Sequence, residues 1–459
     1  MSIVSVNVFQ QVASAPSTLQ RTGAMISTGA TTLAANASSF LTQASDLTPL
    51  LAGAVSITAA STTWSGGVVT MTTATAHGFL SGDSVTVTGF TGAGYLGYNG
   101  TYTITVTGTT TFTYSQAATL TSPASGTAAV TDADVAELVA MVGTFFAQGS
   151  SVGVYVLELG HGTTDANVAA LSAYLTANPG KFYRYLVPRG FDADANFVTL
   201  VASYTSTTAK VYFHVTATLS SYSSFTATNG KSVFMLIEAT GIPATEFTSA
   251  APFWVALSYN PSSSQKVTPF CYSYVFAVTP YPATPTQQTT FKTANLNYVT
   301  TGAEGGISNL MVVNGTTADG NPVNYWYSVD YAQITGQQAL AAAVINGSNN
   351  PLAPLDYDQQ GINTLELVVQ GMAGSMVSFN LAVGPVTAYS LPAADFTALI
   401  ESGNAPLGVL INAVPFVSYV ALNPTDYPIG KYAGISMSYT PARGFQNIVF
   451  NIGVANFIP

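Results

Sequence analysis

The 459-residue sequence has very few charged side chains. Lys and Arg together number 10 and Asp and Glu number 20, so 7% of the residues are charged, against roughly a quarter in an ordinary soluble domain. The net charge of -10 and the pI near 4.5 exclude the basic surface that holds a phosphate backbone. Nucleic acid is therefore not an expected partner, and a surface so poor in charge is typical of a chain that associates.

Cysteine, histidine and long apolar runs are also scarce. The single cysteine, Cys271, excludes an intrachain disulfide. No stretch approaches the roughly 18 consecutive apolar residues of a membrane span, and the N-terminus lacks the basic and apolar regions of a signal peptide. We therefore expect a chain made in the cytoplasm, not inserted in a membrane, and stabilised by burying its apolar residues, which make up 48% of the sequence.

Residues 1–27 are expected to form an extended N-terminal arm. Val4, Val6 and Val8 alternate with polar residues, which is the period of a β-strand. No hairpin partner follows, because a stretch of Pro, Ser and Thr comes next. This strand must pair with a distant segment or with another chain.

Residues 54–130 differ in composition from the rest of the chain. They are rich in Thr, Ser, Gly and Val and contain no Lys or Arg. Short strand patterns separated by turn signals such as Asn99-Gly100 recur along this block, at residues 67–73, 84–90, 101–106, 110–115 and 127–130. The spacing predicts an inserted all-β domain, either an Ig-like sandwich or a small barrel.

Residues 28–53 and 131–285 predict a middle α/β domain around that insertion. A helix is expected after Thr131 and a second near Thr164, and residues 38–51 also have a helix-type sequence. Runs that are apolar on both faces predict a mixed, largely parallel sheet covered by helices, and they lie at residues 152–159, 182–187, 210–215 and 233–239. The predicted fold class is therefore α/β.

A Pro-rich passage at residues 280–285 marks the expected start of a C-terminal α/β domain, residues 286–459. It contains a strand at 310–313, a helix around 331–345 and an amphipathic helix from Ile362 to Phe379. Two strand patterns, 434–439 and 447–457, are expected to close the chain as a β-hairpin or arm.

Motifs that suggest chemistry have simpler explanations. Residues 149–153 match the G-x-S-x-G elbow around Ser151, but a helix precedes them and a strand follows, the reverse of the order that an elbow needs. Asp192 and Asp194 resemble the start of a calcium loop whose later ligands are missing. Asp356 and Asp358 stand just before a helix, where the dipole favours carboxylates without catalysis.

The three histidines, His77, His161 and His214, have no second His or Cys at metal-ligand spacing. His161 is the best candidate among them, because it follows a predicted parallel strand, where open α/β sheets bind ligands. A structural role remains the simpler reading even there. We therefore expect no enzyme activity, no metal and no cofactor.

Three stretches of the chain resemble the contractile-tail sheath proteins of bacteriophages, in particular a myophage sheath family with a short N-terminal arm. Residues 3–8 with Ala15-Pro16-Ser17 look like the family's arm and the segment after it. Residues 314–320, 329–331 and 354–361 resemble its C-terminal domain, and residues 426–432 with the hairpin at 435–457 resemble its terminal β segment. The insertion, with residues 76–87 and 98–102, looks like a β module that recurs in phage structural proteins.

This resemblance implies a structural subunit of a phage tail that contracts to drive the tube into the host envelope. Such subunits stack as hexameric rings around a tail tube, and their terminal arms add strands to neighbouring sheets. The implied partners are further copies of the chain, the tube protein, and the baseplate and tail terminator proteins, with the virion tail as the location. The arm residues implied here are Val4, Val6, Val8, Ile448, Phe450, Ile452 and Val454.

One feature departs from that family. Its members carry a more usual charge content, whereas this chain has few ionic pairs to offer a partner. The alternative function is a carbohydrate-binding adhesin or spike that uses the Thr-rich β module. It predicts exposed aromatic rings on that module, with Trp64, Tyr95, Tyr98 and Tyr102 as the candidates.

Overall fold

The computed structural model describes residues 18–192, 194–206, 208–227, 230–262, 264–302, 308–383 and 409–446. The chain divides into two compact units, which are described one at a time. The sheet unit comprises Arg21–Ser258 and Tyr272–Asn321, and the helical unit comprises Met1–Gln20, Tyr259–Cys271 and Pro322–Pro459. Among the helices so described, none combines the length and apolar character that crossing a membrane requires.

A six-stranded sheet forms the centre of the sheet unit. Its order is β14-β13-β12-β1-β11-β2, and the strands are β1 (Gly23–Ser27), β2 (Ser38–Leu41), β11 (Val154–Glu158), β12 (Arg184–Leu186), β13 (Tyr212–Ala217) and β14 (Val233–Ile237). Every pair is parallel except β11 with the edge strand β2. This confirms the predicted mixed, largely parallel sheet.

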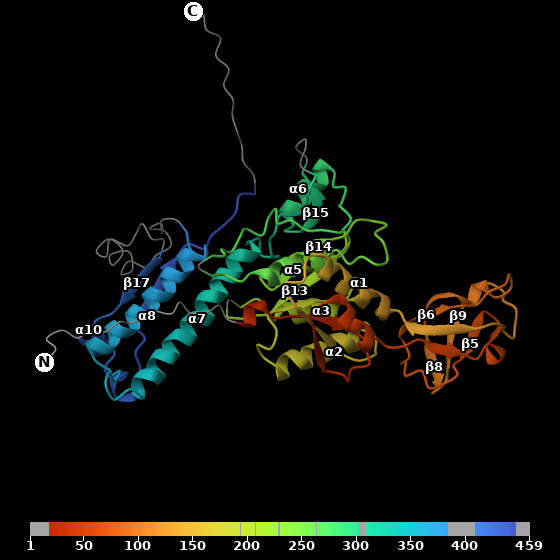
Figure 1. Ribbon diagram of the computed structural model, residues 1–459, viewed down its shortest axis with the longest axis horizontal. Coiled ribbons are helices and arrows are strands. Elements are labelled where there is room, and N and C mark those ends of the chain that lie inside the picture. The colour runs from red at the N-terminus through yellow and green to blue at the C-terminus, as the bar shows by residue number, and fades with distance from the viewer. Residues whose placement is uncertain are drawn as a thin grey trace, which may run out of the picture. The chain divides into compact units, whose positions relative to one another are not determined.

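Helices cover both faces of this sheet (Figure 1). Met25 and Val156 pack with α1 (Asp134–Ala147) and α5 (Ala250–Ser258) on one face. Their chain neighbours Ala24 and Leu157 point to the other face of the sheet, where they pack with α2 (Thr164–Ala177) and α3 (Ala195–Ala202). Since both faces are buried, the strands read as continuous apolar runs.

The inserted residues form two packed antiparallel sheets. Their orders are β3-β10-β6-β7 and β4-β5-β9-β8. The strands are β3 (Val55–Ile57), β4 (Thr63–Ser65), β5 (Val68–Thr72), β6 (Ser84–Thr88), β7 (Gly100–Thr103), β8 (Thr105–Gly108), β9 (Thr111–Ser115) and β10 (Ala128–Asp132). Val85 and Val87 face the core while the threonines beside them point outward, which is the expected alternation of a two-faced strand.

The remaining elements of the sheet unit are short. They are α4 (Tyr222–Thr226), α6 (Pro285–Thr293) and the antiparallel pair β15 (Tyr298–Thr301) and β16 (Leu310–Val313). Thr284 caps α6, and its hydroxyl accepts from the amide of Gln287 while Gln287 bonds back to the Thr284 amide. This capping box fixes the start of the helix just after the Pro-rich passage.

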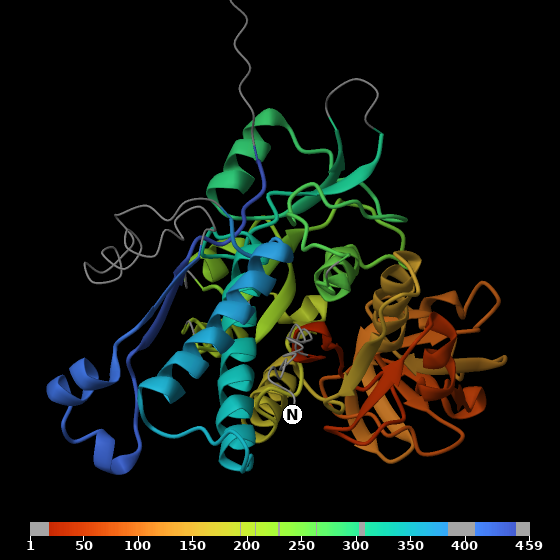
Figure 2. The same ribbon diagram turned by 60° about the vertical axis from the view of Figure 1, so that its left-hand side comes forward.

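Two long helices dominate the helical unit. Figure 2 shows α7 (Val323–Ser348) beside α8 (Gln359–Ser378), with the strand pair next to α8. The strands β17 (Val409–Ala413) and β18 (Ile435–Tyr439) are antiparallel, and α10 (Phe416–Leu422) lies between them in sequence. The side chain of Asp358 caps α8 by accepting from the amide of Gly361.

In the sheet unit the helix predicted after Thr131 is present as α1, but its predicted cap and the helix predicted at residues 38–51 were wrong. Thr131 does not cap α1, because β10 continues through Thr131 and Asp132 in register with β6, and Asp132 instead accepts from the amide of Asp134. Residues 38–51 form the edge strand β2 followed by a 3-10 helix, Ala44–Leu50, and not an α-helix. Pro49 lies inside that 3-10 helix and cannot donate the bond that an α-helix would need.

In the helical unit one helix boundary needs correction and one strand prediction is confirmed. The helix expected around residue 331 begins earlier, at Val323. The sequence did not indicate this start because the polar residues Asn324 and Ser328 interrupt the apolar period. Both are buried, and they bond to the carbonyls of Ala442 and Leu381. The strand predicted at 434–439 pairs with β17 in the described residues. Its predicted hairpin partner, 447–457, lies outside them.

Candidate assembly surface

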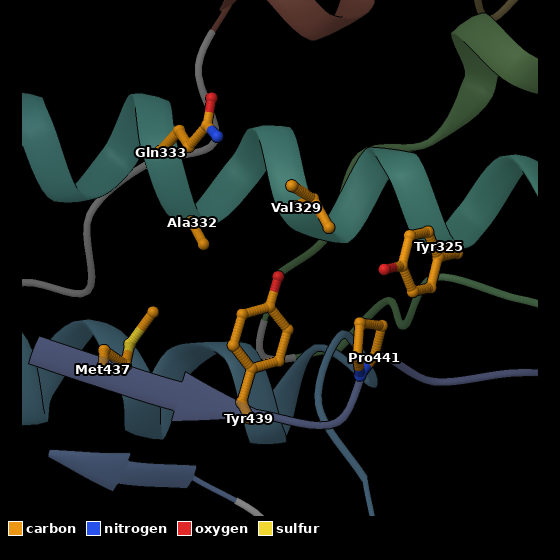
Figure 3. Close-up of a pocket in the computed structure, with 7 residues that line it drawn as sticks. All are labelled: Tyr325, Val329, Ala332, Gln333, Met437, Tyr439 and Pro441. Atoms are coloured by element: carbon orange, nitrogen blue, oxygen red, sulfur yellow. The ribbon is translucent and has the colours of Figure 1, made fainter. Parts of the chain in front are cut away.

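A groove lies between α7 and β18 in the helical unit (Figure 3). Its volume is about 350 Å³, and it is lined by Tyr325, Val329, Ala332, Gln333, Met437, Tyr439 and Pro441. Tyr325, Val329 and Gln333 follow one another at intervals of four residues, and Ala332 stands three residues after Val329, which places all four along one face of α7. Met437 and Tyr439 are two apart and share a face of the strand. The helix and strand periods together therefore build a mostly apolar and aromatic groove.

Polar contacts hold α7 to neighbouring segments of the helical unit. The Ser328 hydroxyl donates to the Leu381 carbonyl at 2.8 Å and lies 3.3 Å from the Tyr439 hydroxyl. The Asn324 amide donates to the Ala442 carbonyl at 2.8 Å. Burial raises the pKa of Tyr439 well above its ordinary value, so its ring presents a neutral hydroxyl at the groove.

The β17–β18 pair lies beside α8. In the part of the chain that the structure describes, the pair forms a two-stranded sheet, and all five residues of β18 are partly exposed. A two-stranded sheet needs a helix or a further strand against it to be stable in water, and α8 supplies the helix. Sequence reasoning missed β17, although residues 407–414 are an apolar run that could have indicated it.

Exposed apolar side chains are dense in the helical unit. The second half of α7 has no buried residue after Thr335, and Ile345 within it is 62% exposed. The exposed large hydrophobics of this unit are Val344, Ile345, Leu352, Leu367, Val383, Val417, Leu422, Tyr427, Ile429 and Phe445. Apolar exposure on this scale is typical of a surface that another protein covers.

The predicted arm residues lie outside the described residues. This holds for Val4, Val6 and Val8 at the N-terminus and for Ile448, Phe450, Ile452 and Val454 at the C-terminus. The contacts of these arm residues are therefore outside what the structure describes.

The residues that resembled catalytic or calcium-binding motifs lie in turns and at helix caps. Ser151 lies in the exposed turn between α1 and β11, so its context is the reverse of a nucleophile elbow. The Asp194 carboxylate accepts from the amide of Phe197 at 2.8 Å and caps α3. Asp192 accepts from the Ser221 hydroxyl at 2.5 Å. These carboxylates hold local backbone in place.

Two of the histidines belong to cores. His77 stacks on Phe79 at 5.1 Å, and its Nδ1 accepts from the Phe79 amide at 3.0 Å. His214 is fully buried in β13, where Arg184 Nη1 lies 3.3 Å from its Nε2. Desolvation, followed by the charge of Arg184, lowers the pKa of His214 well below its usual value.

His161 lies where the inserted module meets the α/β core. Its Nδ1 is 2.9 Å from Asp132 Oδ2 and 3.6 Å from Asp83 Oδ2. The hydrogen bond to Asp132 raises the pKa of His161, and burial raises that of Asp83. Burial, helped by the charge of Asp132, raises the pKa of Asp134 to about 7. Sequence spacing could not reveal this group, because its members come from three separate segments.

The aromatic residues proposed for carbohydrate binding pack against the module's own core. Tyr98 is fully buried, and Tyr102 stacks on Tyr114 with ring centroids 4.0 Å apart. Trp64 is partly buried, and its indole nitrogen donates to the Gln116 carbonyl at 3.0 Å. Tyr95 also packs against this core. The exposed rings that the adhesin hypothesis required are therefore absent at these four positions.

Comparison with solved structures identifies the fold. The contracted helical sheath of the anti-feeding prophage, a cryo-EM structure, aligns with 99% of this chain and 99% of its own at a TM-score of 0.52 and 11% identity. A sheath tail protein of Listeria innocua aligns with 92% of this chain and 94% of its own at 9% identity, but its TM-score of 0.42 is too low to support a conclusion. No protein-family model and no curated protein sequence matches the chain. The chain has a contractile-sheath fold.

Proposed function

We propose that this chain is the structural subunit of a contractile phage-type tail sheath. The observation that carries the proposal is the alignment with a contracted helical sheath over 99% of both chains. An agreement that extends over the whole length includes both units and the connections between their elements, so it favours a shared architecture over a single shared domain. At 11% identity this alignment shows the fold.

Two physical features of the helical unit support self-assembly. The β17–β18 pair is a small, partly exposed sheet in the described residues, and in this proposal an arm of another subunit adds to a sheet by β-augmentation, in which main-chain hydrogen bonds supply the affinity. The exposed apolar residues, from Val344 to Phe445, would lose their contact with water in a lattice of identical subunits. In this proposal the subunits stack as hexameric rings around a tail tube.

The arms of the proposal are residues 3–9 and 447–457. Strands donated by these arms keep neighbouring subunits linked while the subunit bodies move during contraction. The energy for contraction comes from an assembled lattice that relaxes to one burying more surface, so neither a nucleotide nor a catalytic site is needed. The other proposed partners are the tail tube, baseplate and terminator proteins, and the proposed location is the virion tail.

Deletion of the arms tests this assignment. Chains lacking residues 1–12 or residues 446–459 should fold and yet lose rods and rings in negative-stain electron microscopy. Circular dichroism and thermal unfolding serve as the folding control. If both truncated chains assemble as fully as the complete chain, the arm assignment is wrong.

A further inference from the structure

Three metal-ligating side chains converge at the junction of the inserted module and the α/β core. Asp83 comes from the turn before β6, Asp132 ends β10, and His161 follows β11. One donor atom of each lies within 4.8 Å of the others, and the imidazole Nδ1 is 2.9 and 3.6 Å from the two carboxylates. Zinc held tetrahedrally at about 2.1 Å separates its ligands by roughly 3.4 Å. The three donors are thus already close to coordination spacing.

Asp83 supplies an independent sign that a cation belongs here. The residue is 5% exposed. Its Oδ2 accepts from the Leu80 amide at 2.7 Å, but its Oδ1 is buried with no hydrogen-bond partner among the described residues. A buried carboxylate oxygen left without a partner is costly, and a metal ion is one of the few groups that can compensate it.

Further carboxyl groups lie close to this cluster. Asp83 and Asp132 face His161, and the neighbouring Asp134 side chain bonds to the hydroxyl of Thr28. Glu158, 1% exposed, accepts from the amides of Gly29 and Gly160 and the hydroxyls of Ser27 and Thr31 on the same side of the junction. One imidazole carries at most a single positive charge against these carboxylates, whereas a divalent ion adds two.

The backbone around His161 leaves room for this arrangement. Gly29 has a φ of +106°, and a Cβ at that position would lie 2.3 Å from His161 Nδ1. Gly82 has a φ of +102°, and its Cβ would lie 2.8 Å from the Thr163 side chain. Glycine is therefore needed on both sides of the imidazole loop, for backbone conformation as well as for space.

We propose that Asp83, Asp132 and His161 bind one zinc ion that clamps the inserted module to the α/β core. Mixed imidazole and carboxylate donors suit zinc, whereas calcium and magnesium prefer oxygen alone. Binding displaces the proton shared between His161 and Asp132 into solvent, because a ligating nitrogen must be unprotonated. The His161 side chain is 26% exposed, which gives the ion a route from solvent and leaves the fourth position to water. This inference is independent of the sheath function.

Zinc binding to the complete chain tests the clamp. Chelator-treated protein should take up one zinc ion per chain in titration calorimetry. Cobalt, used as a spectroscopic probe in place of zinc, should give the visible absorption bands of a tetrahedral site. Added zinc should raise the thermal unfolding midpoint by a few degrees, because the ion binds the folded chain.

Variants locate the ion. Asp83→Asn and His161→Gln should each weaken zinc binding by at least about 100-fold and remove the cobalt bands, because changes to residues that only support a ligand already cost up to about 100-fold. Asp165→Asn, the same change at an exposed carboxylate of α2, should leave both unchanged. Circular dichroism checks that each variant folds. Absence of saturable zinc binding, an unfolding midpoint independent of zinc, or full binding by both ligand variants would overturn the proposal.

Discussion

At the scale of single residues, Arg184 and His214 are buried together in the centre of the main sheet. Arg184 lies between the rings of Tyr183 and Tyr212, at 5.1 and 5.0 Å, and its Nη1 faces His214. A guanidinium in that position can donate to a neutral imidazole but is repelled by a protonated one. The centre of the main sheet therefore depends on His214 remaining neutral.

We predict that this histidine makes the folded chain less stable in mild acid. The pKa of His214 is lowered in the folded chain. Below the unfolded value of about 6.5, the unfolded chain therefore binds more protons than the folded chain, and the free energy of unfolding decreases as the pH decreases. The loss should approach about 1.4 kcal/mol per pH unit below about pH 6. Urea unfolding between about pH 7.5 and about pH 5.5 measures it.

His214→Gln is the matched variant for this measurement. Glutamine offers Arg184 an acceptor and does not titrate. His161, whose pKa is shifted in the opposite direction, titrates in both proteins and cancels in the difference. If the variant loses stability as steeply as the original chain, His214 is not the responsible group.

The sequence predicted residues with local roles better than residues with distant partners. Thr163 and Asp358 lie at helix starts that the order of residues indicates, and both cap helices. The Asp83, Asp132 and His161 group was not predictable, because 49 and 29 positions separate its members and the fold alone brings them together. Likewise, no pattern in the sequence marks that the side chains of Arg184 and His214 meet diagonally across adjacent strands.

At the scale of elements, the second half of α7 has no buried residue when only the described part of the chain is considered. Residues 336–348 are partly or fully exposed, and Val344 and Ile345 are 47% and 62% exposed. Alanine-rich sequence keeps such a segment helical without tertiary contacts. We infer that this segment forms part of the lattice contact.

We predict that Val344→Lys combined with Ile345→Lys will impair assembly but not folding. Exposed substitutions change the free energy of unfolding by roughly 0.5 kcal/mol or less, whereas two charges in an apolar contact oppose its burial. Gln337→Lys, at an exposed polar position of the same helix, is the control. Chemical unfolding and electron microscopy read out the two effects, and normal rods from the double variant would contradict the inference.

Elements were predictable where one rule dominated. The strands of the main sheet are buried on both faces, so unbroken apolar runs marked β13 and β14. Residues 38–51 were predicted as a helix because their apolar residues have helical spacing. In the structure Ser38–Leu41 instead pairs with β11 as the edge strand of the sheet. The start of α7 was missed because Asn324 and Ser328 are buried through contacts with distant carbonyls.

At the scale of the whole molecule, the scarcity of charge determines how copies of this chain can meet. With 30 charged residues in 459, an interface has few ion pairs to use, and main-chain hydrogen bonds and apolar contact must carry it. Salt screens exposed ion pairs but does not weaken apolar burial. The proposed lattice should therefore tolerate high ionic strength.

Negative-stain electron microscopy of the purified complete chain, at low and at about 1 M salt, tests the central claim most directly. The account predicts rings or helical rods at both salt concentrations, with undiminished length at the higher one. A chain that stays monomeric at high protein concentration, with neither rings nor rods in either buffer, would contradict it.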